Sequence, residues 1–119
     1  MTTTSWPLIV PNLFDRKWLL TELSWRVLHE DVFISPIYST ENSQSQAAVL
    51  HYLPGSKIPR HRHPGYEHIL ILHGSQRDGK NTYGPGTLVI SNPESQHQID
   101  SPEGCIALGI WEKPVEFLC

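Results

Sequence analysis

Turn-forming residues divide this chain into short segments, and this division limits its fold more than any other feature of the sequence. Ten prolines and eight glycines interrupt 119 residues at short intervals. The segments between them are rich in β-branched and aromatic residues and have the length of strands. We therefore predict an all-β, single-domain protein whose short strands form a sandwich or a barrel.

The predicted strands alternate with polar, proline-containing or glycine-containing turns, among which Asp78-Gly79 is a typical hairpin-turn pair. They are Trp25–Leu28, Val32–Tyr38, Ala47–Leu53, Ile58–His63, Glu67–His73, Thr87–Ser91, Gln96–Asp100 and Cys105–Trp111.

The N-terminal part of the chain differs from the rest. Phe14–Leu23 is the one segment with helical character, and Asn12 or Asp15 would serve as its N-cap. The same residues could instead form an arm packed on the barrel. We expect residues 1–24 to pack on the barrel or on a dimer partner, and residues 25–119 to form the β-barrel.

Composition excludes several classes of function. The net charge is −3 and there is no run of Lys or Arg, which argues against nucleic-acid binding. The apolar stretch Ile69–Leu72 is far too short to span a membrane. The N-terminus lacks the basic start and apolar core of a signal peptide, so we expect a cytoplasmic protein.

The two cysteines, Cys105 and Cys119, do not form a disulfide framework. We interpret Cys105 as a small buried apolar residue. The alternative is a redox-sensitive thiol near the functional site.

Four side chains predict a metal site. His61 and His63 are two residues apart on a predicted strand, so both imidazoles point to one face. Pro64-Gly65 then turns the chain, and Glu67 opens the next strand. We expect these three side chains to converge from one hairpin and His97 to join them from a later strand.

The donor types limit the ion. Three imidazoles and one carboxylate suit one divalent zinc, iron, manganese or nickel ion per chain. The absence of thiolate ligands argues against a closed structural zinc site. Four protein ligands would leave one or two positions open on an octahedral ion.

This pattern resembles a known family. Gly55-x5-His61-x-His63-x3-Glu67-x6-Gly74 resembles the first cupin motif in full, and the segment from Gly86 to His97 resembles the second. Asn92 and Glu94 replace the usual proline and glycine of that second motif, and Ser101 stands in the place of its asparagine. The resemblance implies a double-stranded β-helix, or jelly-roll barrel, which is commonly dimeric through an outer sheet face.

Within the cupins, the chain bears a closer resemblance to the ChrR-type domain, which forms the C-terminal half of certain anti-sigma factors and also occurs alone. The resemblance covers Ala47 to Trp111 and implies a stand-alone cupin domain without the zinc-binding anti-sigma half. Tyr66-Glu67-His68 departs from the usual Gly-Glu-Glu. The matching residues are His61, His63, Gly65, Glu67, Leu72, Gly74, Asp78, Gly79, Tyr83, Gly86, Thr87, His97 and Glu103-Gly104-Cys105.

Strand geometry separates the other candidates from the ligands. His68 should point away from the site, and His73 should share the face of Glu67 but lie roughly 20 Å along the strand. Arg60 and Arg62 should point outward. Tyr66 either overhangs the barrel mouth or simply covers a turn.

Three functions remain open. The first is a metal-dependent enzyme, dioxygenase-like or isomerase-like, that acts on an oxygenated small molecule. The second is a ligand-sensing or redox-sensing module that works through a regulatory protein partner. The third is a structural metal site without turnover. The fold alone does not choose among them.

Overall fold

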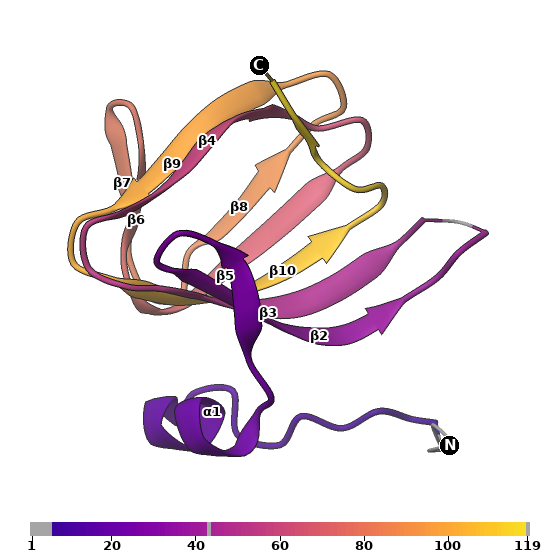
Figure 1. The fold of residues 1–119 in the computed structure, drawn as a ribbon, viewed down its shortest axis with the longest axis vertical. Coiled ribbons are helices and arrows are strands. Elements are labelled where there is room, and N and C mark those ends of the chain that lie inside the picture. Colours follow the sequence, from indigo (N-terminus) through magenta and orange to yellow (C-terminus); the bar gives the residue numbers. More distant parts are fainter. Residues whose placement is uncertain (1–5, 43, 119) are drawn as a thin grey trace.

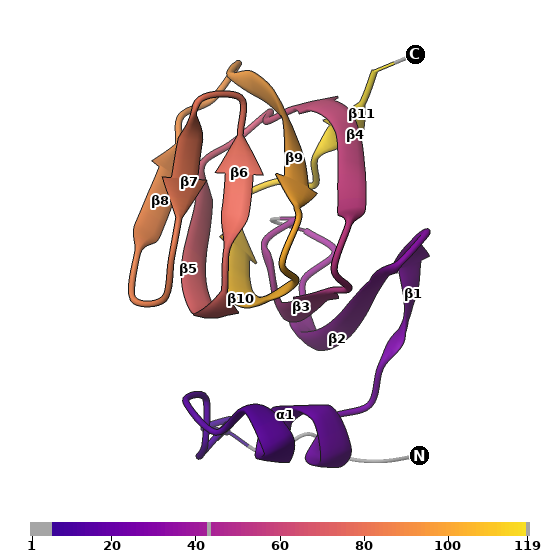
Figure 2. The same ribbon diagram turned by 90° about the vertical axis from the view of Figure 1, so that its left-hand side faces the viewer.

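Two antiparallel sheets face each other in the computed structural model, which describes residues 6–42 and 44–118 (Figures 1 and 2). The first five residues of the predicted arm and Cys119 lie outside the described part. The six-stranded sheet has the order β1 (Arg26–His29), β2 (Val32–Ser39), β3 (Gln46–Tyr52), β10 (Cys105–Trp111), β5 (Glu67–Gly74) and β8 (Leu88–Ser91). The five-stranded sheet has the order β11 (Glu116–Phe117), β4 (Ser56–Arg62), β9 (Gln96–Ser101), β6 (Gln76–Asp78) and β7 (Asn81–Tyr83).

The all-β, cupin-like prediction is therefore confirmed. Residues that alternate along β3, β5 and β10 point between the sheets and form the core. This core includes Leu50, Ile69, Ile71 and Ala107, which meet Ile58 and Ile99 of the facing sheet.

One prediction about the local topology is wrong. β4 and β5 do not form a hairpin, because β4 pairs with β9 and β11 whereas β5 pairs with β10 and β8. The turn at Pro64-Gly65 carries the chain from one sheet to the other. Glu67 therefore meets the two histidines from across the barrel and not from a neighbouring strand.

The predicted hairpin near Asp78 is present, with one shift. Asp78 pairs with Asn81, so the two-residue loop is Gly79-Lys80 and not Asp78-Gly79. The three-residue strands β6 and β7 on either side of this loop were not among the predicted strands.

A β-bulge corrects the prediction for His73. Ala107 pairs with Ile71 and Ile106 pairs with His73, which leaves Leu72 as the extra residue. Because Ile106 and Leu72 belong to the outer hydrophobic cluster, His73 leaves the face of Glu67. It lines a separate pocket together with Arg16 and His51.

The helix is shorter than predicted. α1 spans Arg16–Glu22, and its N-cap is Asp15, whose carboxylate accepts a hydrogen bond of 3.0 Å from the backbone N–H of Trp18. Leu19 is fully buried against Val49 and Ile106 on the outer face of the six-stranded sheet. Together with the partly buried Trp18 and Leu20, it attaches α1 to the barrel, below which the helix lies in Figure 1.

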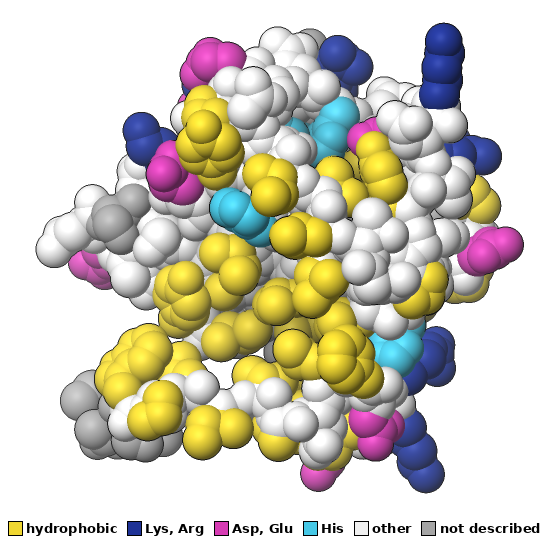
Figure 3. Space-filling view, turned by 180° about the vertical axis from the view of Figure 1, so that it is seen from behind, with side chains coloured by type: hydrophobic (Ala, Val, Ile, Leu, Met, Phe, Trp, Pro, Cys, Tyr) yellow, Lys and Arg dark blue, Asp and Glu magenta, His cyan; other side chains and the backbone are white. Residues whose placement is uncertain are grey.

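Part of the outer surface remains apolar. Leu88, Ile90 and Ile110 are exposed on the six-stranded sheet, as are Trp6 and Phe14 in the N-terminal segment. Figure 3 shows hydrophobic side chains gathered above that segment. The homodimer expected from the family resemblance stays a prediction. Within residues 6–42 and 44–118, no helix is long and apolar enough to cross a membrane.

Candidate metal centre

The structure brings the four predicted residues together at one end of the barrel. His61, His63, Glu67 and His97 each offer one ligand atom, and these atoms lie within 4.8 Å of one another. His61 and His97 are direct cross-strand partners on β4 and β9, with ring centroids 4.6 Å apart. His61, His63 and Glu67 are buried, and His97 is half-buried.

Hydrogen bonds on the far side of each ring orient the first two histidines. The Nδ1 of His61 lies 2.9 Å from the carbonyl oxygen of Pro59. Because a carbonyl only accepts, this nitrogen carries the proton, and Nε2 keeps its lone pair.

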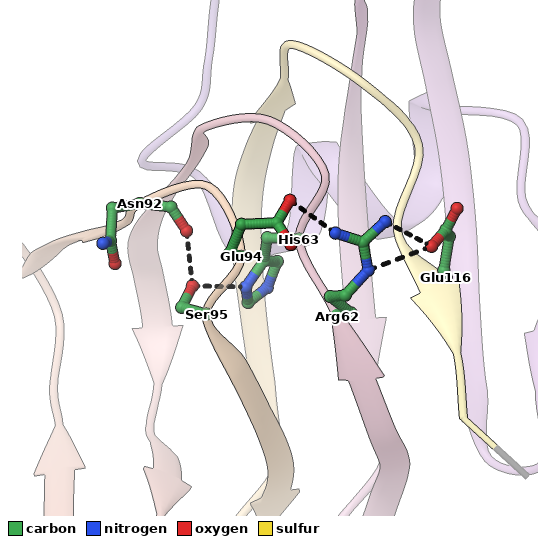
Figure 4. A network of polar contacts seen from close by, with 6 residues as sticks. All are labelled: Arg62, His63, Asn92, Glu94, Ser95 and Glu116. Atoms are coloured by element: carbon green, nitrogen blue, oxygen red, sulfur yellow. Dashed lines mark hydrogen bonds and ion pairs between the residues drawn. The ribbon is translucent and has the colours of Figure 1, made fainter.

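The same logic holds for His63 (Figure 4). Ser95 Oγ donates to the carbonyl oxygen of Asn92 at 2.6 Å, so its own proton is used. The Ser95 Oγ atom must then accept a hydrogen bond from Nδ1 of His63, which lies 3.0 Å away. The Nε2 atom of His63 is buried, and no residue in the described chain donates a hydrogen bond to it. A buried lone pair in this situation fits a bound cation.

Glu67 is held in the same way. Nε1 of Trp111 donates to its Oε2 atom at 2.8 Å. The other oxygen, Oε1, lies 3.3 Å from Nε2 of His63 and 3.8 Å from Nε2 of His97. One oxygen is thus fixed by the indole, and the other faces the three imidazoles.

The electrostatics fit a cation. Burial lowers the pKa of His61 and lowers that of His97 to about 4, which keeps both imidazoles neutral at physiological pH. Burial alone would raise the pKa of Glu67, but contacts with His63 and the Trp111 N–H hold it below its usual value. His61 and His97 therefore present neutral nitrogen donors and Glu67 presents a carboxylate, which is the protonation state that metal binding requires.

Trp111 is a residue of this candidate site that sequence reasoning did not assign to it. Its contact with Glu67 joins strands 44 residues apart in the sequence. Gly109 makes the contact feasible, because a Cβ atom there would overlap the indole ring. In the sequence, a glycine two positions before a tryptophan on one predicted strand indicates that the indole packs over the glycine, since the two residues share a face.

Arg62 points outward, as predicted, and ties the segments around His63 together. Its guanidinium forms ion pairs with Glu94 at 2.5 Å and Glu116 at 2.7 Å (Figure 4). Hydrogen bonds to these carboxylates raise the pKa of Arg62. Glu94 precedes Ser95, so the network holds the loop that orients His63.

The cluster borders a cavity of about 220 Å³ inside the barrel, and His61, Glu67 and His97 form part of its wall. Most of the remaining wall is apolar, with Leu50, Ile69 and Ile99 among its residues. An ion held by the four side chains would be reachable from this space.

Two weaker candidates do not join the site. Tyr66 is 46% exposed and is not part of the cavity wall, which favours the surface interpretation. Cys105 is buried in the core, and burial raises the pKa of its thiol to about 12. A thiol in that state is a poor nucleophile, which favours the packing role over the redox role.

Replacing Trp111 with phenylalanine tests the support of Glu67. We expect metal affinity to fall about 10- to 100-fold, because Glu67 loses the donor that fixes its second oxygen. A chelator competition titration measures this. Trp25→Phe is the control, since the Trp25 N–H donates to the carbonyl oxygen of Leu19 outside the barrel. Equal affinity in both variants would refute the role of Trp111.

Comparisons with known proteins identify related chains and structures. Residues 18–114 match the family model of the ChrR cupin-like domain. The chain is 34% identical over 73 residues to the anti-sigma-E factor ChrR of Cereibacter sphaeroides, an alignment that covers 59% of this chain and 34% of that protein. The chain thus spans about a third of the length of this curated relative.

Two solved structures have a fold similar to that of this chain. The Rhodobacter sphaeroides SigE complex with the anti-sigma ChrR matches with a TM-score of 0.69 and 26% identity, over 80% of this chain and 54% of that one. A putative acetylacetone dioxygenase from Methylibium petroleiphilum PM1 matches with a TM-score of 0.78 and 12% identity, over 100% of this chain and 86% of that one. At that identity the second match indicates the fold alone.

Proposed function

The chain belongs to the ChrR cupin-like domain family, and from this premise we propose that it is a metal-dependent enzyme for a small oxygen-containing molecule. His61, His63, Glu67 and His97 would hold one divalent ion, either zinc, iron, manganese or nickel. The observation that carries the proposal is the cavity of about 220 Å³ that borders this cluster. A purely structural ion would not need such a space beside it.

When bound, a divalent ion in such a site polarises the oxygen atoms of a ligand. The protein supplies the rest. The wall offers mainly apolar surface, and the hydrogen bonds to Pro59, Ser95 and Trp111 fix the donor atoms before a ligand arrives. These features suit dioxygenase-like or isomerase-like chemistry at the ion.

A second candidate function is a ligand-sensing module that acts through a regulatory protein partner. The 34% identity to the anti-sigma-E factor ChrR favours it. In this case the same cavity would bind a ligand, and ligand binding would change how the exposed apolar surface binds the regulatory partner. The redox variant of this hypothesis has less support, because Cys105 is buried and protonated.

The test combines metal analysis with a turnover assay. The metal content of the purified protein is measured, and the metal-free protein is then reloaded separately with zinc, iron, manganese or nickel. Each form is assayed with acetylacetone, catechol and small hydroxy acids while oxygen consumption is recorded. We expect turnover with at least one ion, and loss of that turnover when a chelator removes the ion. Oxygen consumption separates a dioxygenase from an isomerase.

The His63→Ala variant is the control for metal-independent background. Stoichiometric metal without turnover on any of these substrate classes would contradict the enzyme proposal and favour the sensing module. A protein that takes up none of the four ions would contradict the enzyme proposal directly.

A further inference from the structure

The cavity has a second polar region away from the metal cluster, formed by the side chains of Tyr52 and Gln76. Both residues line the cavity, and both are about 95% buried, with exposed fractions of 5% and 4%. Tyr52 comes from β3 of the six-stranded sheet and Gln76 from β6 of the facing sheet. The region therefore lies where the two sheets close on each other.

The amide nitrogen of Gln76 is the unusual atom in this region. It is fully buried, yet it makes no hydrogen bond of acceptable geometry to any residue in the described chain. Its polar neighbours are the Tyr52 hydroxyl and the Cys105 thiol, and interaction with the Gln76 side chain partly offsets the rise that burial causes in the pKa of each. A buried donor without a partner costs roughly 1–3 kcal/mol, and such groups in native structures call for an explanation.

Other polar groups of the cavity wall have partners in the protein. Oε2 of Glu67 accepts from Trp111, and the Tyr83 hydroxyl donates to Asp78 at 3.0 Å. The Gln76 nitrogen differs from them, because it forms a hydrogen bond of acceptable geometry with neither the Tyr52 hydroxyl nor the Cys105 thiol beside it.

The position of Gln76 sets the length of that molecule. Arg77, its neighbour on β6, pairs with Asp100, so the antiparallel register places Gln76 opposite Ser101, four residues beyond His97 on β9. Four residues of strand correspond to about 13 Å between the two levels. The wall between them is apolar and includes Ile58 and Ile99.

The net charge of the metal centre determines which chemical group of the incoming molecule would lie beside the ion. Three neutral imidazoles and one carboxylate on a divalent ion leave a net charge of +1. A monoanionic oxygen group such as a carboxylate or an enolate would neutralise that charge.

We propose that the cavity binds small oxo acids or related oxo anions, whose anionic end meets the metal centre and whose distal carbonyl oxygen accepts a hydrogen bond from the Gln76 amide. Gln76 is then a specificity-determining residue, and the Tyr52 hydroxyl adjoins the same oxygen. This inference rests on the proposed metal site and adds the substrate class.

Isothermal titration calorimetry on the zinc-loaded protein tests it with isosteric pairs. Levulinate is compared with isocaproate, which has a methyl-bearing carbon in place of the ketone, and the next two homologues of each acid extend the series. We expect at least one oxo acid to bind about tenfold more tightly than its branched partner, because the partner leaves the amide donor unpaired.

Two variants test whether Gln76 causes the difference in affinity between the two acids of a pair. In Gln76→Leu the affinity ratio should fall to about one, whereas in Gln46→Leu, a change at a second cavity-lining glutamine, it should remain. Gln76→Met provides the same test if the leucine variant fails to fold. Equal affinity within every pair, no binding of any acid, or a ratio that persists in the Gln76 variants would overturn the inference.

The experiment distinguishes a failure of the proposed metal site from a failure of the proposed role of Gln76. In the first case the protein would take up no zinc, but discrimination within a pair would persist if Gln76 provides it. The reverse result, bound zinc with no discrimination, would refute only the role of Gln76.

Discussion

Replacing His63 with alanine is expected to remove the metal ion from the purified protein. The imidazole is 1% exposed, and its Nε2 atom faces the other three ligand atoms. The loss of an outer partner of a metal ligand already lowers affinity about 10- to 100-fold, so the loss of the ligand itself should lower it by more than about 100-fold. Metal analysis of the purified variant, followed by chelator competition, measures the change.

His68→Ala is the matched control. His68 directly follows Glu67 but belongs to the other face of β5, where it pairs with Ile90 and Ile110. We expect this variant to hold as much metal as the native chain. If the His63 variant also retained one ion per chain, the assignment of the four ligands would be wrong.

The sequence was sufficient for the parts of the fold where one local signal dominates. β10 has the predicted bounds, because Cys105–Trp111 is an apolar run between a Pro-Glu-Gly turn and a charged segment. Asp15 caps α1, as one of two predicted N-caps. The four candidate ligands come together because period-two alternation fixes which side chains of a strand share a face.

Features that depend on contacts between distant segments could not be read in this way. The sheet to which a strand belongs is decided by its partners, so the turn after His63 resembled a hairpin although β4 and β5 lie in different sheets. The bulge at Leu72 reverses the face of His73 through its pairing with β10, and no residue type marks it. The donor to Glu67 is a tryptophan 44 residues away, chosen by packing over Gly109.

The last glycine of the first motif, Gly74, is expected to be indispensable for stability. Its φ angle is +75°, and a Cβ atom at this position would overlap the carbonyl oxygen of Gly104. Two separate costs therefore arise in Gly74→Ala: a backbone conformation that disfavours side chains, and a collision with the backbone of the next segment. The first costs about 1–2 kcal/mol. Since backbone atoms cannot rotate away as a side chain can, we expect a total loss above about 3 kcal/mol.

Gly79→Ala separates the two costs. Gly79 has a φ angle of +60°, but nothing lies within 4 Å of the position that its Cβ atom would occupy. This variant should therefore lose only about 1–2 kcal/mol. Urea unfolding of both variants in the metal-free state measures the difference without a contribution from ion binding. Equal losses would mean that Gly104 yields to the added methyl group, and that Gly74 occurs in the motif for its backbone angle alone. A markedly larger loss for Gly74→Ala would show instead that the close approach of Gly74 and Gly104 is needed where β5 meets β10.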